Sequence, residues 1–225
     1  MEHCADCQTK SPLFNKLSEE ELARIEKHKV TKCFSKGEVI FSINEPINEF
    51  VYLSSGLVKL TKINKFGKEQ IVTIARPKDM VGLLTVFSNS NYQYTMTALV
   101  DSKVCFVGIS AFRELTITNP QFAIDVIKTI SSISDDIIRH TYAINSKNLR
   151  GRIALILMDF SENIYESDNF ELPLSRKELA EMIDMTPENV IRILSEFKRD
   201  DLIRVKGKNI ELINKRMIEK VRDLG

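Results

Sequence analysis

Short apolar runs separated by turn-forming residues make up the first half of the chain. A capping box, Ser18 with Glu21, begins a predicted helix near the N-terminus. Between residues 29 and 109, β-branched runs alternate with Gly, Asn, Asp and Pro, which predicts a small antiparallel barrel or roll. Tight turns that need a positive φ are expected at Gly37, Gly56, Gly67 and Gly82.

Two amphipathic segments joined by a short turn lie near the C-terminal end. The first starts at a capping box, Ser175 with Glu178, and the second starts with Thr186 as N-cap and Pro187 as its first residue. This pattern predicts a helix-turn-helix unit, whose second helix enters a DNA major groove. The apolar positions that would hold the two helices together are Leu179, Ala180, Ile183, Val190, Ile193 and Leu194.

Polar side chains occupy the outer face of the second predicted helix, near its N-terminal end. They are Glu188, Asn189 and Arg192. Arg forks onto guanine, Asn pairs with adenine, and Glu accepts a hydrogen bond from the cytosine amino group. We therefore expect these three residues to contact DNA, together with the cap residues Thr186 and Ser175. An ordinary helical hairpin is the alternative interpretation.

A hairpin pattern follows this unit. Two short segments, residues 202–205 (LIRV) and 209–212 (NIEL), flank Lys206-Gly207-Lys208. The pattern predicts a β-hairpin wing. Lys206 and Lys208 at its tip would rest on the phosphate backbone of DNA.

A long helical pattern runs from residue 120 to residue 145, and a second helix, at residues 149–163, leads into the helix-turn-helix. Apolar positions in the long helix are spaced by threes and fours, as in a coiled-coil seam. The seam packs either on the protein's own roll or against a second copy. We favour a parallel dimer seam, because operator-binding helix-turn-helix proteins usually pair across a two-fold axis. The predicted interface residues are Val126, Ile130, Ile133 and Ile137.

Composition and net charge limit the kinds of binding partner and the cellular compartment to be expected. With 225 residues the chain is long enough for two domains of ordinary size, and its net charge is only +1. Any positive potential for DNA must therefore be local. The chain has no signal-peptide pattern and no apolar run near the roughly 20 residues of a membrane helix, so we expect a cytoplasmic protein without membrane contact. Its four cysteines are then expected as thiols or metal ligands.

The order of these parts resembles that of the cyclic-AMP receptor and anaerobic-regulator superfamily of bacterial transcription factors, called Crp/Fnr. The motifs that carry the resemblance are residues 36–41 (KGEVIF), 52–60 (YLSSGLVKL) and 151–154 (GRIA), with the helix-turn-helix. The resemblance implies an α+β fold: an N-terminal antiparallel β-roll that is cupin-like and similar to a cyclic-nucleotide-binding domain, a long dimerisation helix, and a C-terminal winged helix-turn-helix. The corresponding domains are residues 1–118, 119–147 and 148–225.

The resemblance also implies partners and a function. The chain would be a homodimeric regulator that binds double-stranded DNA at a palindromic operator and contacts RNA polymerase. Glu188 and Arg192 fall on the family's main base-reading positions, which implies a central G·C pair in each half-site. Pro187 stands where cyclic-AMP-type members carry a further guanine-reading Arg, so direct readout of that outer base pair should be absent.

The effector implied by the best-known members does not fit this sequence. In those members a Gly-Glu pair and a downstream Arg hold the ribose and the cyclic phosphate. Here the equivalent stretch begins Gly82-Leu83, and Tyr94 lies where the Arg would be expected. Phosphate recognition relies heavily on Arg, so cyclic AMP is not expected. Gly82, Leu83 and Tyr94 would line a pocket for a less charged effector, or for none.

Cysteines supply a candidate cofactor site. The oxygen-sensing branch of the family holds an iron–sulfur cluster with three cysteines in its tail and a fourth late in the roll. Cys4 and Cys7 form a Cys-x-x-Cys pair in the tail, and Cys105 resembles the late position. The third tail cysteine is missing, and Cys33 or His3 would have to complete the four ligands.

Three alternatives compete with these interpretations. Cys33 and Cys105 would otherwise pack as small apolar side chains, and the tail pair would be an idle or peroxide-sensitive dithiol. A redox enzyme that uses Cys4 and Cys7 is disfavoured, because such motifs begin a helix beside a βαβ unit, whereas these lie in a polar tail. We therefore do not expect an enzyme. A roll whose degenerate DNA domain binds only proteins is the third alternative.

Overall fold

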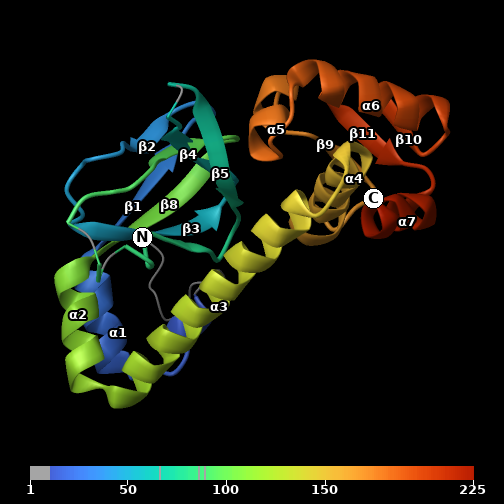
Figure 1. Cartoon of the computed structure of the whole chain (residues 1–225). Helices are drawn as coiled ribbons and strands as arrows, with labels where there is room; N and C mark the ends of the chain where they lie inside the picture. The colour runs from blue at the N-terminus through green and yellow to red at the C-terminus, as the bar shows by residue number, and fades with distance from the viewer. Residues whose placement is uncertain (1–10, 66, 86, 89) are drawn as a thin grey trace. The chain divides into compact units, whose positions relative to one another are not determined.

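The chain folds into two compact units, and the main division between them falls within helix α3, between Asp136 and Ile137. The computed structural model describes residues 11–225 except residues 66, 86 and 89 (Figure 1). Cys4, Cys7 and His3 therefore lie outside the described residues.

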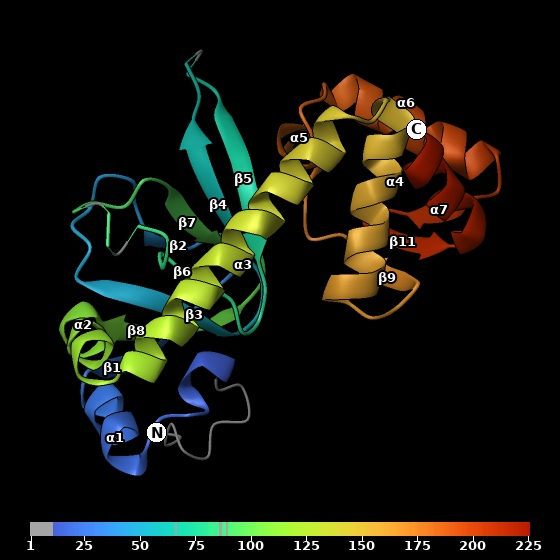
Figure 2. The same ribbon diagram turned by 60° about the horizontal axis from the view of Figure 1, so that its bottom comes forward.

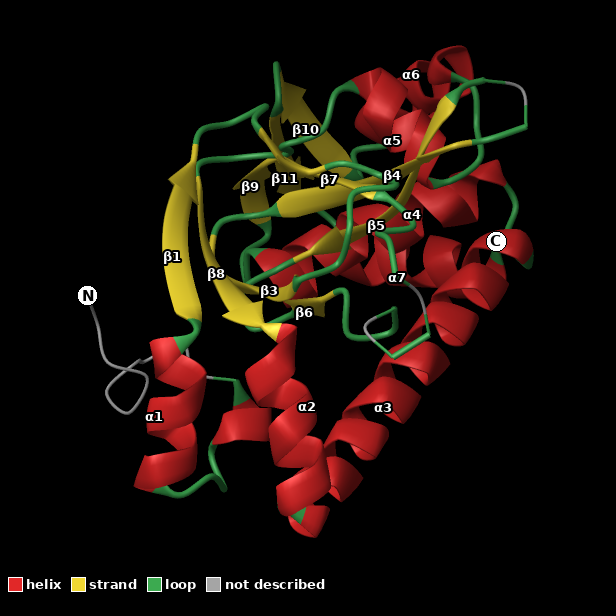
Figure 3. Cartoon of the chain, turned by 90° about the vertical axis from the view of Figure 1, so that its left-hand side faces the viewer, coloured by secondary structure: helices red, strands yellow, loops and turns green. Residues whose placement is uncertain are grey.

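The first unit contains the predicted antiparallel roll. Its strands form one sheet in the order β1-β8-β3-β6 and another in the order β2-β7-β4-β5 (Figure 3). Strand β8 pairs antiparallel with both β1 and β3. The bounds are β1 (Lys29–Phe34), β2 (Val39–Phe41), β3 (Glu49–Ser55), β4 (Val58–Ile63), β5 (Glu69–Ala75), β6 (Met80–Val81), β7 (Thr95–Ala98) and β8 (Ser102–Gly108).

Glycines at the turns of the roll have the backbone conformation that the sequence predicted. The φ angles of Gly37, Gly56, Gly67 and Gly82 are 89°, 93°, 73° and 94°. At Gly56 a side chain would also have no room, because a Cβ there would lie 2.2 Å from Ser102 Oγ. Conformation and space together require glycine at this position.

Helices pack at one end of the roll around an aromatic centre. Helices α1 and α2 lie side by side there, and Phe112 of α2 contacts Phe50 of β3 and Phe122 of α3 with ring centroids 4.7 and 5.3 Å apart (Figures 1 and 3). Ser18 caps α1 in a complete capping box with Glu21, as predicted. The bounds are η1 (Pro12–Phe14), α1 (Glu19–Lys27), α2 (Ile109–Thr118) and α3 (Pro120–Asn145).

Helix α3 has two apolar stripes, and the predicted dimer stripe is the one that faces inward. Val126 is 3% exposed in the same core as Phe112, and Ile130 and Ile133 pack against that core. Only the last predicted residue, Ile137, is substantially exposed, at 47%. Val126, Ile130 and Ile133 thus pack on the core of the first unit, which is the alternative arrangement that the sequence left open. The second stripe is exposed and consists of Ile124, Ile127, Ile138 and Tyr142.

The second unit is a winged helix-turn-helix on a short helical base. Figure 2 shows α4 beside α7, in agreement with their contacts. The predicted helix at 149–163 is α4, whose last turn is a π-helical segment, η2; the sequence did not predict β9 or α7. The strands form one sheet in the order β10-β11-β9. The bounds are α4 (Leu149–Asp159), η2 (Phe160–Ile164), β9 (Asn169–Glu171), α5 (Arg176–Met182), α6 (Pro187–Arg199), β10 (Ile203–Lys206), β11 (Asn209–Leu212) and α7 (Lys215–Leu224).

The turn between α5 and α6 is fixed by an arginine of α4. Asp184 adopts a positive φ of 51° at the end of α5. Arg152 Nη1 donates to the carbonyl oxygens of Ile183 and Asp184 at 3.0 and 3.1 Å, and its Nε donates to the Lys147 carbonyl at 3.1 Å. The motif at residues 151–154 thus satisfies carbonyl groups that a helix end leaves without partners.

Candidate nucleic-acid interface

Helices α5 and α6 begin at the residues that the sequence predicted. Ser175 Oγ accepts from the Glu178 backbone N–H at 3.2 Å, and Glu178 Oε2 accepts from the Ser175 backbone N–H at 2.8 Å. Thr186 Oγ1 accepts from the Asn189 backbone N–H at 3.3 Å, with Pro187 as the first residue of α6. The hydroxyl oxygens of both predicted cap residues therefore accept backbone hydrogen bonds at the start of their helices.

The outer face of α6 carries the predicted base-reading residues. Its inner face is fully buried, so the rotation of the helix about its axis is fixed. Glu188 and Arg192 are exposed one turn apart on the opposite side, and Asn189 is half-buried beside them. The structure thus brings Glu188, Asn189 and Arg192 together on one exposed surface. The buried inner-face residues are Val190, Ile193, Leu194 and Phe197.

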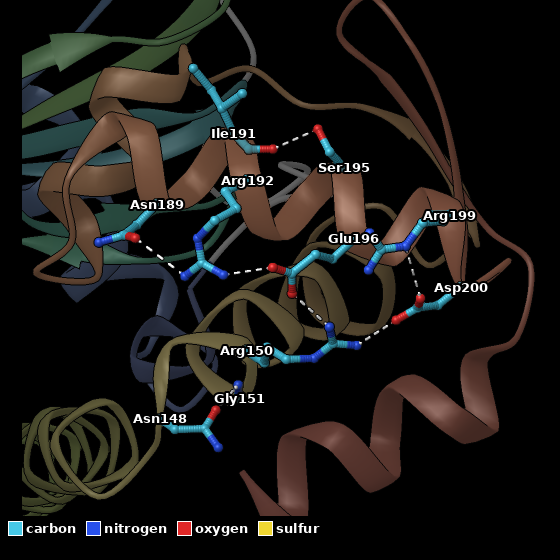
Figure 4. A network of polar contacts seen from close by, with 10 residues as sticks. All are labelled: Asn148, Arg150, Gly151, Asn189, Ile191, Arg192, Ser195, Glu196, Arg199 and Asp200. Atoms are coloured by element: carbon cyan, nitrogen blue, oxygen red, sulfur yellow. Dashed lines mark hydrogen bonds and ion pairs between the residues drawn. The ribbon is translucent and has the colours of Figure 1, made fainter.

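Charges on this face are ordered by local hydrogen bonds. The pKa of Glu188 is lowered by hydrogen bonds from its own backbone N–H and from the Thr186 hydroxyl, so its carboxylate is ionised at neutral pH. Arg192 Nη1 donates to Glu196 Oε1 at 2.6 Å, and Nη2 donates to Asn189 Oδ1 at 3.3 Å (Figure 4). The surface therefore offers an acceptor and a fixed guanidinium side by side, which is the chemistry that a G·C pair requires.

Ile191 is a residue of this surface that the sequence analysis missed. It is 53% exposed between Glu188 and Ser195 on the same side of α6. The Ser195 hydroxyl donates to the Ile191 carbonyl at 2.8 Å. An exposed apolar side chain among base-reading residues is suited to the methyl group of thymine. Only the helix rotation distinguishes it from the buried isoleucines nearby.

The predicted wing is present and carries the two predicted lysines. Strands β10 and β11 pair from Ile203 with Leu212 to Lys206 with Asn209, and Gly207 turns the chain with a φ of 63°. Lys206 and Lys208 are exposed on either side of Gly207. Arg176, at the start of α5, donates to the Gly207 carbonyl at 3.3 Å, and burial lowers the pKa of its guanidinium. The wing tip is thereby tied to the helix-turn-helix.

Two of the residues expected to line an effector pocket, Leu83 and Tyr94, pack against apolar cores of the first unit. Leu83 is 1% exposed in the core around Phe112. Tyr94 packs against the core of the roll; burial raises the pKa of its phenol, while hydrogen bonds with the Thr85 side chain and the Gly82 backbone act in the opposite direction. Thr85 Oγ1 in turn donates to the Gly82 carbonyl at 2.9 Å. Neither Leu83 nor Tyr94 supplies a cation for phosphate.

The cysteines within the described residues do not form a cluster site. Cys105 is buried in β8 with its Sγ 3.4 Å from Thr31 Oγ1, and Cys33 is exposed on β1, paired with Lys103. Within residues 11–225, leaving aside 66, 86 and 89, no three His, Cys, Asp or Glu side chains are grouped to hold a metal ion. Cys4 and Cys7 lie outside the described residues. The described residues thus offer one shielded thiol and one exposed thiol.

The fold and the exposed face of α6 define a class of protein: a DNA-binding regulator with a winged helix-turn-helix and a sensor-type roll. The chain matches the family described as cyclic nucleotide-binding domain over residues 31–119 and that described as Crp-like helix-turn-helix domain over residues 151–221. The chain belongs to the Crp/Fnr family, and it is a sequence-specific DNA-binding transcription regulator of that type.

Relatives and solved structures agree with this assignment. The transcriptional activator protein FnrA of Stutzerimonas stutzeri is 26% identical over 94% of this chain and 89% of its own length. The structure of FixK2 from Bradyrhizobium japonicum aligns with a TM-score of 0.77 and 22% identity, over 86% of this chain and 96% of FixK2. A CRP-family transcriptional regulator from Thermus thermophilus aligns with a TM-score of 0.73 and 19% identity, over 85% and 96%. Among the described residues, no helix is long and apolar enough to cross a membrane.

Proposed function

We propose that the chain acts as a homodimer that reads a palindromic operator through α6. The observation that carries this proposal is the exposed pair Glu188 and Arg192 on a helix whose opposite face is fully buried. Arg192 would donate to a guanine, and Glu188 would accept from the amino group of a cytosine. Asn189 supports Arg192, Lys206 and Lys208 contact phosphates, and the capped start of α6 points positive backbone N–H groups at the duplex.

Dimerisation is proposed through the exposed stripe of α3. Two recognition helices can grip one face of a duplex only if they stand about 34 Å apart, which a monomer cannot arrange. Ile124, Ile127, Ile138 and Tyr142 form an apolar surface on a long helix, with spacings of three, eleven and four residues, close to one, three and one helical turns. Ile137 lies on the neighbouring stripe. Contact with RNA polymerase is proposed from family membership alone.

Ile191 is proposed to contact a thymine beside the central G·C pair. It follows Glu188 by three residues and precedes Arg192, so all three face the same stretch of groove. Its side chain has no hydrogen-bonding group and would recognise the thymine methyl by contact alone.

The test of the proposed function is an Arg192→Ala variant of the full chain. A palindromic duplex selected from a random library provides the operator, and binding to it is compared with binding to a scrambled duplex. Arg192→Ala should lose about 1–3 kcal/mol of preference for the operator in each half-site, the value of one bidentate base contact. Arg216→Ala removes an exposed arginine of α7 and should keep the preference. An unchanged preference in Arg192→Ala would show that α6 is not the reader.

An iron–sulfur cluster held through Cys4, Cys7 and Cys105 is the second candidate for the signal. The Cys4-x-x-Cys7 pair favours it, although the buried Cys105 would have to break its contact with Thr31. Cys33 is the remaining thiol for a fourth ligand. Protein purified without oxygen should then show iron, sulfide and a visible absorbance that oxygen removes. A colourless, iron-free protein that binds its operator fully would eliminate this candidate; cyclic AMP is not proposed as effector.

A further inference from the structure

Arg192 is one end of a line of charged side chains that begins on α4 (Figure 4). Arg150, in the first turn of α4, donates from Nη1 to Glu196 Oε2 at 2.7 Å. The other oxygen of Glu196 accepts from Arg192. Each oxygen of the Glu196 carboxylate therefore has its own arginine, and Glu196 connects the base-reading surface to α4.

Arg150 is itself held on three sides. Its Nη2 donates to Asp200 Oδ2 at 2.9 Å, so one planar guanidinium spans Glu196 and Asp200, which lie four residues apart. Its Cζ lies 4.9 Å from the centre of the Phe197 ring, and Phe197 is fully buried. A charged group stacked on a fixed ring and shared by two carboxylates has little freedom to move.

This arrangement differs from an ordinary surface ion pair. An exposed ion pair between Arg192 and Glu196, without Arg150, would hold the two side chains only weakly. Here the Glu196 side chain is mostly shielded from solvent, and its pKa is lowered, chiefly by the hydrogen bond from Arg150. An arginine has five N–H donors; Arg192 uses two of them in the contacts with Glu196 and Asn189, which leaves three for DNA.

We infer that Glu196 and Arg150 are positioning residues for base readout: they fix the Arg192 guanidinium before DNA binds and thereby set how strongly guanine is preferred. The inference rests on the proposed function, because it requires Arg192 to contact a base. A side chain that must be ordered on binding weakens affinity by about 2- to 10-fold. Arg150 and Glu196 remove this cost for Arg192.

The experiment measures guanine discrimination, defined as the ratio of affinities for the selected operator and for the same duplex with its central G·C pair changed to A·T. In Glu196→Gln the amide offers one acceptor oxygen in place of two. Guanine discrimination should fall about 2- to 10-fold, while affinity for scrambled DNA stays within about twofold of the Glu181→Gln control. Glu181 is the matched control because it also pairs with a basic residue four positions away, Lys177, on α5.

A charge-matched variant separates geometry from charge. Lys at position 150 keeps the positive charge but lacks the planar fork that reaches two carboxylates at once. Arg150→Lys should therefore reduce guanine discrimination in the same direction as Glu196→Gln. Because the effect acts through Arg192, adding Glu196→Gln to Arg192→Ala should cause no further loss of discrimination. A merely structural role would instead lower affinity for every duplex in both backgrounds.

The outcomes distinguish this inference from the proposed function. Operator preference that survives Arg192→Ala would overturn both. If Arg192→Ala abolishes guanine discrimination but Glu196→Gln and Arg150→Lys retain it fully, only the positioning role is wrong. Discrimination that rises in Glu196→Gln would also overturn it, because Glu196 would then be competing with DNA for Arg192. Thermal unfolding checks that each variant is folded. If Glu196→Gln does not fold, the measurements on Arg150→Lys decide the question.

Discussion

At the scale of single residues, Ile191 gives the sharpest prediction about sequence preference. Replacing each thymine of the half-site in turn by deoxyuridine removes one methyl group and nothing else. At one position the native protein should bind about fourfold more weakly, since burying a CH₂ group contributes about 0.8 kcal/mol. Affinities from fluorescence anisotropy at fixed salt provide the measurement.

The variant Ile191→Ala shows whether that methyl effect belongs to Ile191. In this variant the same thymine-to-deoxyuridine change should have almost no effect, because the side chain that would meet the methyl group is already truncated. Ile213→Ala removes another exposed isoleucine of the second unit and should behave as the native protein does. An equal methyl effect in all three proteins would place the thymine contact elsewhere.

Residue-level features were predictable where they depend on near neighbours in sequence. The caps at Ser175 and Thr186 follow from residues three positions apart, and both form as expected. The Arg150–Glu196 contact could not be predicted, because 46 residues separate the two and only the packing of α4 on α6 brings them together. Ile191 has the same residue type as its buried neighbour Ile193, and the rotation of the helix decides between them.

At the scale of elements, the wing should supply affinity without sequence preference. Changing Lys206 and Lys208 to Ala should weaken binding to operator and scrambled duplexes equally. The slope of log K against log salt concentration should become shallower by about 0.9 for each phosphate that is no longer neutralised. Titrations at several salt concentrations measure this slope. The matched control is Lys220→Ala, on an exposed face of α7; a weakening confined to the operator would contradict the phosphate role.

Most elements with strong local signals were predicted, whereas a short strand and the C-terminal helix were not. The long helix α3 has the bounds that the sequence indicated, Pro120–Asn145. Strand β9 has only three residues, too few to show an apolar period. Helix α7 does have a helical period, with apolar residues at Met217, Ile218, Val221 and Leu224, and the sequence prediction overlooked it. On α3 the spacing revealed a stripe but could not say what covers it. Phe112 and Phe122 decide this by building a core against Val126.

At the scale of the whole molecule, substitutions on α3 test which of its two apolar stripes forms the dimer interface. The neighbouring residues Ile137 and Ile138 are 47% and 65% exposed and belong to different stripes. Ile138→Asp places a charge in the proposed interface, so sedimentation should show monomers. Operator affinity should then fall by about 100-fold or more, because each monomer engages a single half-site. Ile137→Asp is the matched control and should remain a dimer. If Ile137→Asp alone dissociated the dimer, the interface would instead be formed by the stripe that contains Ile137, as the sequence predicts.

The three carbonyl contacts of Arg152 have a consequence for signalling. Its guanidinium joins Lys147, two residues after the end of α3, to the turn between α5 and α6. Within the second unit, a displacement at the C-terminal end of α3 would therefore reach the turn before α6 through these hydrogen bonds.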